Sequence, residues 1–336
     1  MNKRNFSRVC MPCSLYCMTY YLLMSTKEEI NNTFFFFAHT IPENLRSHFP
    51  NSTFLNIKGS WIYKFNFLLA PYMIVKRFIK WPFLFKADIY GLDFYWFLLR
   101  GLKNNYIEDC PFVLDIWETS SLYKFYIEAE NTNLIKKLLR RLLYGEYYLH
   151  PVGTSSSTKA IYTSIPYNKP YHKGLPNIVV DLRKAWRDSC EEKKNFILSV
   201  YGITNEDLEL MKTRNVLILT QPMYIDKVMS RDEQIDIYRE MIDKYGILNV
   251  IVKPHPRDTL DYKGLFPGVI YFNKVVPMQL LAILGVNFKK VATVNSSSAL
   301  SFGKDADIDW WAEQLDCPRI TDSGVKTLAE AKRLFQ

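Results

Sequence analysis

The stretch of residues 215–253, which opens with NVLILT and closes with NVIVK, decides the fold of this chain. Both ends are runs of branched apolar residues, which are typical of strands buried on both faces of a parallel sheet. Between them, Ser230 and Glu233 form a capping box, which predicts a helix over Arg231–Tyr245 that Gly246 terminates. The stretch therefore predicts a strand, a helix and a second, parallel strand.

The alternation of strands and helices continues toward the C-terminus. Strands are predicted at Val269–Phe272 and Lys290–Val294, and a helix that begins with proline is predicted at Pro277–Leu284. Such alternation indicates a parallel sheet, which binds its ligands at the carboxyl ends of its strands. The fold class predicted is therefore α/β.

The N-terminal half is less regular. Within the first 25 residues we expect a short strand, a turn at residues 11–14 and a helix. Four consecutive phenylalanines favour a buried strand over Asn32–Thr40. Further along, we expect a strand at Pro111–Trp117, a basic amphipathic helix at Asn133–Tyr148, and a long loop or linker over the Ser-, Thr- and Pro-rich residues 150–177.

Length and charge set the outer limits on function. The chain has 336 residues, enough for two domains, and 43 Lys and Arg against 34 Asp and Glu give a net charge of +9. A basic surface favours anionic partners, but no known nucleic-acid module is visible, so nucleic acid is not an expected partner. The sequence contains no run of 18 uncharged apolar residues, so a membrane-spanning helix is not expected. Sparse cysteines indicate a reducing compartment, and we expect a cytoplasmic protein.

The first polar cluster follows NVIV directly and reads Lys253-Pro254-His255-Pro256-Arg257-Asp258. Its two prolines stiffen the turn and hold His255 in one place, while Lys253 and Arg257 add positive charge. A phosphate group fits this chemistry, with His255 able to donate a proton to a leaving oxygen. A histidine in a rigid surface turn without a ligand is the alternative interpretation.

The second cluster is Ser296-Ser297-Ser298, directly after the predicted strand KKVATV. Small hydroxyl groups and backbone N–H groups at the start of a helix form an anion site. An ordinary N-cap serine run is the alternative. Together, the two clusters suggest that a phosphate-bearing donor binds here, although the chain has no Walker motif and no G-x-G-x-x-G.

Several acids are candidates for a general base. Asp226 lies in the loop after NVLILT and would act as the base or cap a turn. Asp232 is a rival, but it stands in the first turn of a helix, where an acid favours the helix dipole. Asp115 and Glu118 in the first half are further alternatives.

Metal and redox chemistry are not expected. Asp305, Asp307 and Asp309 resemble a metal-binding D-x-D pattern, but they lie in an acidic stretch that we interpret as solvated charge. Cys10 and Cys13 form a single C-x-x-C, which would suit a redox pair, although buried thiols are the favoured interpretation. No histidine pair has zinc-protease spacing.

The sequence resembles the bacterial sialyltransferases of glycosyltransferase family 52, which act on lipooligosaccharide and capsule. The resemblance rests on four segments in order, namely VCMPCSLY (9–16), LILTQPMYID (217–226), KPHPRD (253–258) and NSSSAL (295–300). It covers most of residues 205–303 well and the first 200 residues loosely. It implies a GT-B type fold with two Rossmann-like domains facing across a cleft. Their expected bounds are 1–185 for the acceptor domain, 186–315 for the nucleotide-sugar donor domain, and 316–336 for a C-terminal helix that packs back.

The resemblance also implies a reaction. Sialic acid would move from CMP-sialic acid to a terminal galactose of a lipooligosaccharide or capsular glycan, with inversion and without a metal or other cofactor. His255 would contact the donor phosphate and assist the departure of CMP, and Asp226 would deprotonate the acceptor hydroxyl. The residues implied in nucleotide-sugar binding are Lys253, Pro254, Arg257, Gln279, Ser296, Ser297 and Ser298.

Two positions depart from the family pattern. Many members carry glutamate in a P-x-E pattern where this chain has Pro277-Met278-Gln279. Glutamine still hydrogen-bonds ribose or a base, but it lacks the charge. The D/E-D/E-G pattern of related sialyltransferases is not intact at Asp115–Glu118. A family enzyme that uses another nucleotide sugar, such as a glucosyltransferase, is therefore an alternative.

The aromatic and basic stretches 61–100 and 133–148 are the candidates for membrane contact. They would dock at the inner face of the cell membrane, where a lipid-linked acceptor lies. Buried aromatics with solvated cations are the alternative. A membrane-associated binding protein without catalysis is a further hypothesis, and the sequence leaves monomer and homodimer open.

Overall fold

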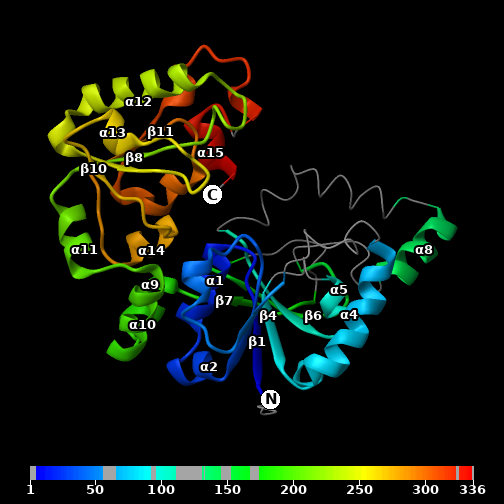
Figure 1. Cartoon of the computed structure of the whole chain (residues 1–336). Helices are drawn as coiled ribbons and strands as arrows, with labels where there is room; N and C mark the ends of the chain where they lie inside the picture. The colour runs from blue at the N-terminus through cyan, green and yellow to red at the C-terminus, as the bar shows by residue number, and fades with distance from the viewer. Residues whose placement is uncertain are drawn as a thin grey trace. The chain divides into compact units, whose positions relative to one another are not determined.

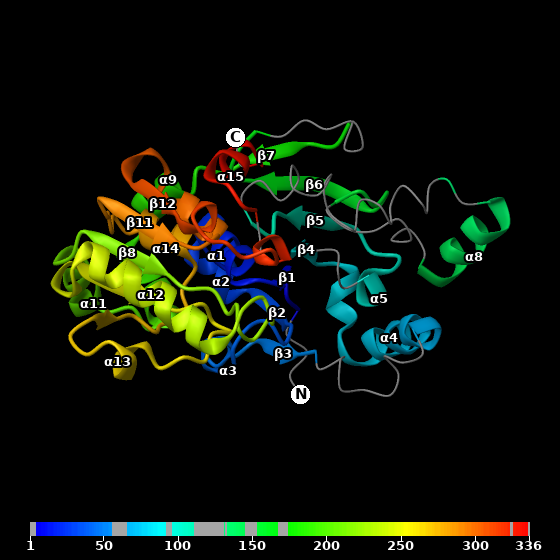
Figure 2. The same ribbon diagram turned by 90° about the horizontal axis from the view of Figure 1, so that it is seen from above.

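The computed structural model describes residues 5–55, 66–91, 96–110, 131, 133–144, 153–166, 174–322 and 325–334. The chain divides into two compact units, Met1–Ile197 and Leu198–Gln336. Each unit has its own sheet, in which every strand pair is parallel, and helices flank it (Figures 1 and 2). The predicted α/β class with two Rossmann-like domains is confirmed.

The first unit contains a seven-stranded sheet in the order β3-β2-β1-β4-β5-β6-β7. The order reverses between β1 and β4, as in a doubly wound fold, and this switch point is where such sheets bind ligands. Gly91 ends β4 with φ at +132°, and a Cβ there would lie 2.4 Å from the carbonyl oxygen of Met11, so only glycine allows the two strand ends to approach this closely. The strands are β1 (Arg8–Met11), β2 (Thr33–Phe37), β3 (Ser52–Phe54), β4 (Asp88–Gly91), β5 (Asn104–Ile107), β6 (Thr158–Thr163) and β7 (Asn177–Val179).

Helices cover both faces of this sheet. The helices α1 and α2 lie on one face, and α4 and α5 lie on the other (Figures 1 and 2). Ser14 begins α1, because its hydroxyl accepts the N–H of Cys17 at 3.1 Å. The helices are α1 (Leu15–Met24), α2 (Lys27–Asn31), α3 (Glu43–Arg46), α4 (Asn66–Lys80), α5 (Trp96–Leu99), α8 (Leu134–Tyr144), α9 (Leu182–Arg187) and α10 (Glu191–Tyr201), with the 3₁₀ turn η2 (Pro82–Phe85).

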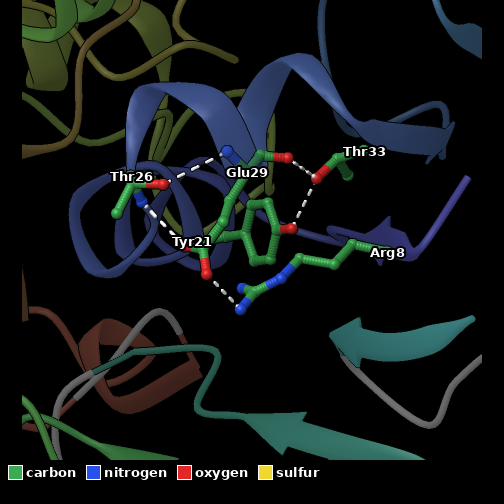
Figure 3. A network of polar contacts seen from close by, with 5 residues as sticks. All are labelled: Arg8, Tyr21, Thr26, Glu29 and Thr33. Atoms are coloured by element: carbon green, nitrogen blue, oxygen red, sulfur yellow. Dashed lines mark hydrogen bonds and ion pairs between the residues drawn. The ribbon is translucent and has the colours of Figure 1, made fainter.

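A polar network fastens α2 to the amino end of the sheet (Figure 3). Thr26 and Glu29 form a capping box, in which Glu29 Oε2 accepts the N–H of Thr26 at 2.8 Å. The other carboxylate oxygen of Glu29 pairs with Arg8 of β1. The hydroxyl of Thr33 donates to the Glu29 carbonyl at 2.6 Å and lies 2.7 Å from the hydroxyl of Tyr21. One carboxylate thus joins a helix cap to the central strand.

Glu29→Ala is expected to lower the free energy of unfolding by about 1–2 kcal/mol, since it removes a helix cap and leaves Arg8 without its carboxylate. Urea denaturation measures the change. Glu28→Ala is the matched control, because Glu28 lies in the same first turn outside this network, and it should change stability by less than about 0.5 kcal/mol. Equal losses in both variants would contradict the role of the network.

The second unit contains a five-stranded sheet in the order β10-β9-β8-β11-β12. The strands are β8 (Val216–Leu219), β9 (Val250–Lys253), β10 (Ile270–Tyr271), β11 (Lys290–Thr293) and β12 (Asp307–Trp310). The helices are α11 (Asn205–Lys212), α12 (Arg231–Tyr245), α13 (Tyr262–Leu265), α14 (Met278–Ile283) and α15 (Leu328–Leu334), and the 3₁₀ turns are η6 (Ile247–Asn249), η7 (Ser297–Asp305), η8 (Trp311–Glu313) and η9 (Ile320–Asp322).

The sequence pattern predicted this second unit closely. The capping box at Ser230 and Glu233 is present, and Gly246 follows the last residue of α12 with φ at +81°. Residues 316–334 lie within the same unit, where the N–H of Leu328 donates to Glu313 Oε1 at 2.6 Å. In the described part of the chain, no helix is long and apolar enough to cross a membrane.

The prediction of a long loop over residues 150–177 is wrong in part. This segment contains β6, which pairs with β5 on one side and β7 on the other, so that Ala160 and Ile161 are buried. The expected domain boundary after residue 185 falls inside α9, ahead of the division between the units. The helix α9 packs on α1, and Lys193 Nζ donates to the Leu23 carbonyl at 2.7 Å, so both α9 and the start of α10 lie with the first unit.

Candidate functional site

Three loops of the second unit leave its sheet at the same edge. Leu219 of β8 pairs with Lys253 of β9 on one side and with Thr293 of β11 on the other. The chain segments that follow these residues are therefore neighbours, and they contain Thr220–Asp226, Pro254–Asp258 and Asn295–Ser298. The sheet thus brings together the loops that the sequence marked as polar clusters.

His255 is held from two sides. Its backbone N–H donates to the hydroxyl of Thr220 at 3.0 Å, and its Nδ1 accepts the N–H of Arg257 at 3.1 Å. Because Nδ1 accepts a hydrogen bond, the neutral ring carries its proton on Nε2. Burial, together with the nearby Arg257 charge, lowers the pKa of His255 below its usual value of 6.5. The arrangement supplies a neutral ring with an Nε2–H donor.

Asp258 fastens this loop to its neighbours, a role that the sequence analysis did not assign. Its Oδ2 accepts the hydroxyls of Thr220 and Tyr262, each at 2.7 Å, and the side-chain amide of Gln234 at 3.3 Å. Its Oδ1 accepts the N–H of Leu260 at 3.2 Å. Since Thr220 also accepts the N–H of His255, the orientation of the histidine loop depends on this carboxylate.

Lys253 lies beneath the site. Its side chain is buried, with 6% of the residue exposed, and Nζ donates to the carbonyl of Lys274 at 3.0 Å. Burial lowers the pKa of Lys253 to about 8. The ammonium therefore ties the end of β9 to the segment that leads into α14.

The serine run begins a 3₁₀ helix. Ser296 is buried, and its N–H donates to the hydroxyl of Thr293 at 3.1 Å. Ser297 is exposed and Ser298 half-buried at the start of η7. The side-chain amide of Asn295 donates to the Ile320 carbonyl at 3.2 Å, which fixes the turn from behind.

Asp226 and Arg257 form an ion pair with each other. The two guanidinium nitrogens of Arg257 lie 2.8 and 2.9 Å from the two carboxylate oxygens of Asp226. The geometry is bidentate, which is the strongest form of this contact. This ion pair competes with a role of Asp226 as the acceptor of a substrate proton. Asp226, the predicted base, and Arg257, the predicted phosphate ligand, are thus paired with each other.

The remaining predicted residues lie in different settings. Gln279 is half-buried in the first turn of α14, after Pro277. Asp232 is 89% exposed in the first turn of α12, 3.8 Å from its neighbour Arg231. Asp115 and Glu118 lie outside the described residues.

A pair of acids at the carboxyl edge of the first sheet was missed by the sequence analysis. Glu108 and Asp109 directly follow β5. Oε1 of Glu108 accepts the hydroxyl of Tyr16 at 2.5 Å and the N–H of Ser164 at 2.8 Å. Burial raises the pKa of Glu108 to about 7 and also raises the pKa of Asp109. The sequence feature that could have identified this pair is the occurrence of two adjacent acids directly after a strand.

Two acids of the D-x-D stretch, Asp307 and Asp309, form ion pairs. Asp309 accepts Lys244 Nζ at 2.7 Å and the indole N–H of Trp311 at 2.9 Å, and Asp307 pairs with Lys290. The interpretation of this stretch as solvated charge is therefore wrong for Asp309. Among the described residues, no three His, Cys, Asp or Glu side chains gather as metal ligands.

The thiol of Cys10 lies in the core of the first unit. Cys10 is fully buried in β1, and burial raises its pKa well above the usual thiol value. No disulfide bond joins Cys10, Cys13 and Cys17. A thiol with a raised pKa forms little nucleophilic thiolate, so these data support the buried-thiol interpretation over a redox pair.

Residues 179–312 match the model of glycosyltransferase family 52. The match includes all three loops of the candidate site, and it confirms both the resemblance predicted from the sequence and the enzyme class, a glycosyltransferase. A protein of Haemophilus influenzae strain Rd, named only as uncharacterized, is 26% identical over 302 residues, which is 88% of this chain and 90% of the relative.

Two solved structures of bacterial sialyltransferases are similar in fold. The GT-B domain of a sialyltransferase from Photobacterium damselae has a TM-score of 0.53 at 13% identity, covering 90% of this chain and 89% of that one. An alpha/beta-galactoside alpha-2,3-sialyltransferase from Photobacterium phosphoreum has a TM-score of 0.47 at 13% identity, with coverage of 90% and 89%. The first of these likenesses shows that the fold is of the GT-B type.

Proposed function

We propose that this glycosyltransferase moves sialic acid from CMP-sialic acid to a terminal galactose of a lipooligosaccharide or capsular glycan, with inversion and without a metal. The single observation that carries the proposal is the fixed His255 at the carboxyl edge of the second sheet, inside the segment that matches family 52. Fold and family support the nucleotide-sugar chemistry, and the identity of the sugar is our inference.

The leaving group explains why this edge suits the reaction. When the bond from the sugar to CMP breaks, negative charge develops on the phosphate oxygens. The Nε2–H of His255 is a hydrogen-bond donor for that charge, and the exposed start of η7 at Ser297 adds backbone N–H groups at the same edge of the sheet. Because both donors are set before the substrate arrives, no reorganisation is needed during the reaction.

A general base completes the proposal. An acid with a pKa near neutrality is the best proton acceptor at neutral pH. Glu108, with its pKa raised to about 7, meets that requirement. Asp226 is engaged by both nitrogens of Arg257 and is the weaker candidate. We therefore assign the base to the acid pair Glu108–Asp109, and we propose attack on the face of the sugar opposite the phosphate, which inverts its configuration.

Release of CMP from CMP-sialic acid, measured with purified protein, a galactose-terminated acceptor and EDTA, tests the reaction. We expect formation of a sialylated product at an undiminished rate in EDTA. If the chain neither turns over CMP-sialic acid nor binds CMP in calorimetry, the donor assignment is wrong. A rate that EDTA abolishes would contradict metal independence alone.

A different nucleotide sugar is the second candidate, and Gln279 is the observation that favours it. Glutamine at this position in α14 offers hydrogen bonds to a base or ribose without the charge of glutamate. Turnover of UDP-glucose in the same assay, without turnover of CMP-sialic acid, would establish this alternative. Turnover of neither donor, with retained membrane binding, would instead favour a binding protein without catalysis.

A further inference from the structure

The helix α8 presents a row of large aliphatic side chains to solvent. Leu134 and Ile135 are each 71% exposed, and Leu138, Leu139 and Leu142 are all more than half exposed. At 3.6 residues per turn, these five positions fall on one half of the helix. Exposed leucines in isolation are ordinary, but a continuous row of them marks an interaction surface.

Cations stand on the other half of the same helix. Lys136 is exposed and Lys137 is half-buried, and both fall opposite the leucine row. A helix with aliphatic side chains on one half and lysines on the other is typical of segments that lie in the interface of an anionic membrane.

The helix α4 contacts α8 and adds to this surface (Figures 1 and 2). Its inner side is fixed, because Met73 is buried and Arg77 Nη1 donates to the carbonyls of Leu98 and Arg100 at 2.8 and 2.6 Å. Its outer side exposes Val75, Phe78 and Ile79. The fold therefore holds α4 in place with three large apolar side chains directed to solvent.

The outer side of α4 carries cations as well. Lys80 is exposed, and Lys76 extends over Trp81, with Nζ 5.6 Å from the centre of a ring. Long lysine side chains of this kind cover apolar surface while the ammonium stays in water. Both helices thus combine exposed apolar groups with positive charge.

We propose that α4 and α8 together form a docking surface for an anionic lipid bilayer. The exposed aliphatic and aromatic side chains would enter the boundary between headgroups and acyl chains, and the lysines would contact the anionic headgroups. A second copy of the chain fits less well, because each copy carries a net charge of +9 and the surface itself is basic. The proposal is independent of the proposed reaction, and it would bring the enzyme to a lipid-linked acceptor.

Co-sedimentation of the full chain with vesicles tests this surface. We expect binding to vesicles of phosphatidylcholine and phosphatidylglycerol, weak binding to phosphatidylcholine alone, and loss of binding as salt rises. Leu139→Glu and Ile79→Glu should each lower the partition coefficient by about tenfold or more, since each replaces an inserted apolar side chain by a charge repelled by the anionic lipid.

Leu248→Glu is the matched control. Leu248 is 74% exposed, about as much as the leucines of α8, but it lies in η6 of the other unit. This variant should bind as the unmodified chain does, and thermal unfolding should show that all three variants fold. Unchanged binding of Leu139→Glu and Ile79→Glu would overturn the proposal. So would a dimer, seen by light scattering, that Leu139→Glu dissociates, because the surface would then be an interface between copies.

Discussion

His255→Ala is expected to lower kcat for sugar transfer by about 10²–10⁴-fold, the range that a positioned proton donor or hydrogen-bond donor supplies. The backbone N–H of His255 donates to Thr220, and the ring accepts the N–H of Arg257, so alanine removes a fixed donor from a loop whose backbone stays anchored. Thermal unfolding should change little, because the ring is only half-buried. Single-turnover release of CMP measures the effect directly.

Two further variants separate the roles of the ring. In His255→Gln, the side-chain amide still donates a hydrogen bond but does not titrate. If His255→Gln recovers part of the kcat that His255→Ala loses, the ring acts as a hydrogen-bond donor. If it recovers no kcat, the ring acts as a proton donor. His48→Ala, an exposed histidine of the first unit, should leave kcat unchanged. Full activity in His255→Ala would contradict the assignment of this loop as the donor phosphate site.

The pH profile follows from the surroundings of His255. Burial and the Arg257 charge favour the neutral ring, so the pKa of His255 lies below 6.5. Since kcat/KM reports the free enzyme, a proton donor at His255 should make kcat/KM fall as the pH rises through this lowered pKa, below 6.5. In Arg257→Ala one cause of the lowered pKa is removed, and the fall should move to higher pH. A fall that stays in place would show that another group titrates there.

The second sheet was predictable because each of its signals is local. The capping box at Ser230 and Glu233 and the short apolar strands all depend on residues a few positions apart. The first sheet was harder, because its inner strand β5 reads Asn-Asn-Tyr-Ile. Asn105 is nevertheless buried, since its side-chain amide donates to the carbonyl of Ile89 on the neighbouring strand at 3.2 Å. Partners this far away in the sequence leave no local pattern.

The site shows the same division between local and long-range information. The sequence identified His255 and the serine run from their positions after strands. It gave no indication that Arg257 would bind Asp226, 31 residues away, because the contact depends on how two loops meet above the sheet. Asp258 was part of the polar cluster, but its role in fastening the loop was not predicted, although Tyr262, one helical turn later, is a partner that the spacing allows.

Glu108→Gln is expected to lower kcat by about 10²-fold, if the acid pair supplies the general base. Glutamine keeps the size of the side chain and an oxygen that accepts the bonds from Tyr16 and Ser164, so the geometry should persist while the proton acceptor is lost. In the unmodified enzyme kcat should rise with pH through about 7, where Glu108 ionises, and this rise should be absent in the variant. Asp226→Asn should reduce kcat by less.

The same substitution has an opposite effect on stability, which makes the prediction distinctive. Because the folded-state pKa is raised from 4.5 to about 7, the unfolded chain gives up this proton first, and stability is lost as pH rises between these values. Ionisation of the buried Glu108 carboxyl should make the free energy of unfolding about 3 kcal/mol lower at pH 8 than at pH 4. Glu108→Gln should remove that loss, so the variant is more stable than the unmodified chain at pH 8. A variant that is stabilised at pH 8 but keeps its full kcat would make Glu108 a structural acid, and the base would then be Asp109 or Asp226.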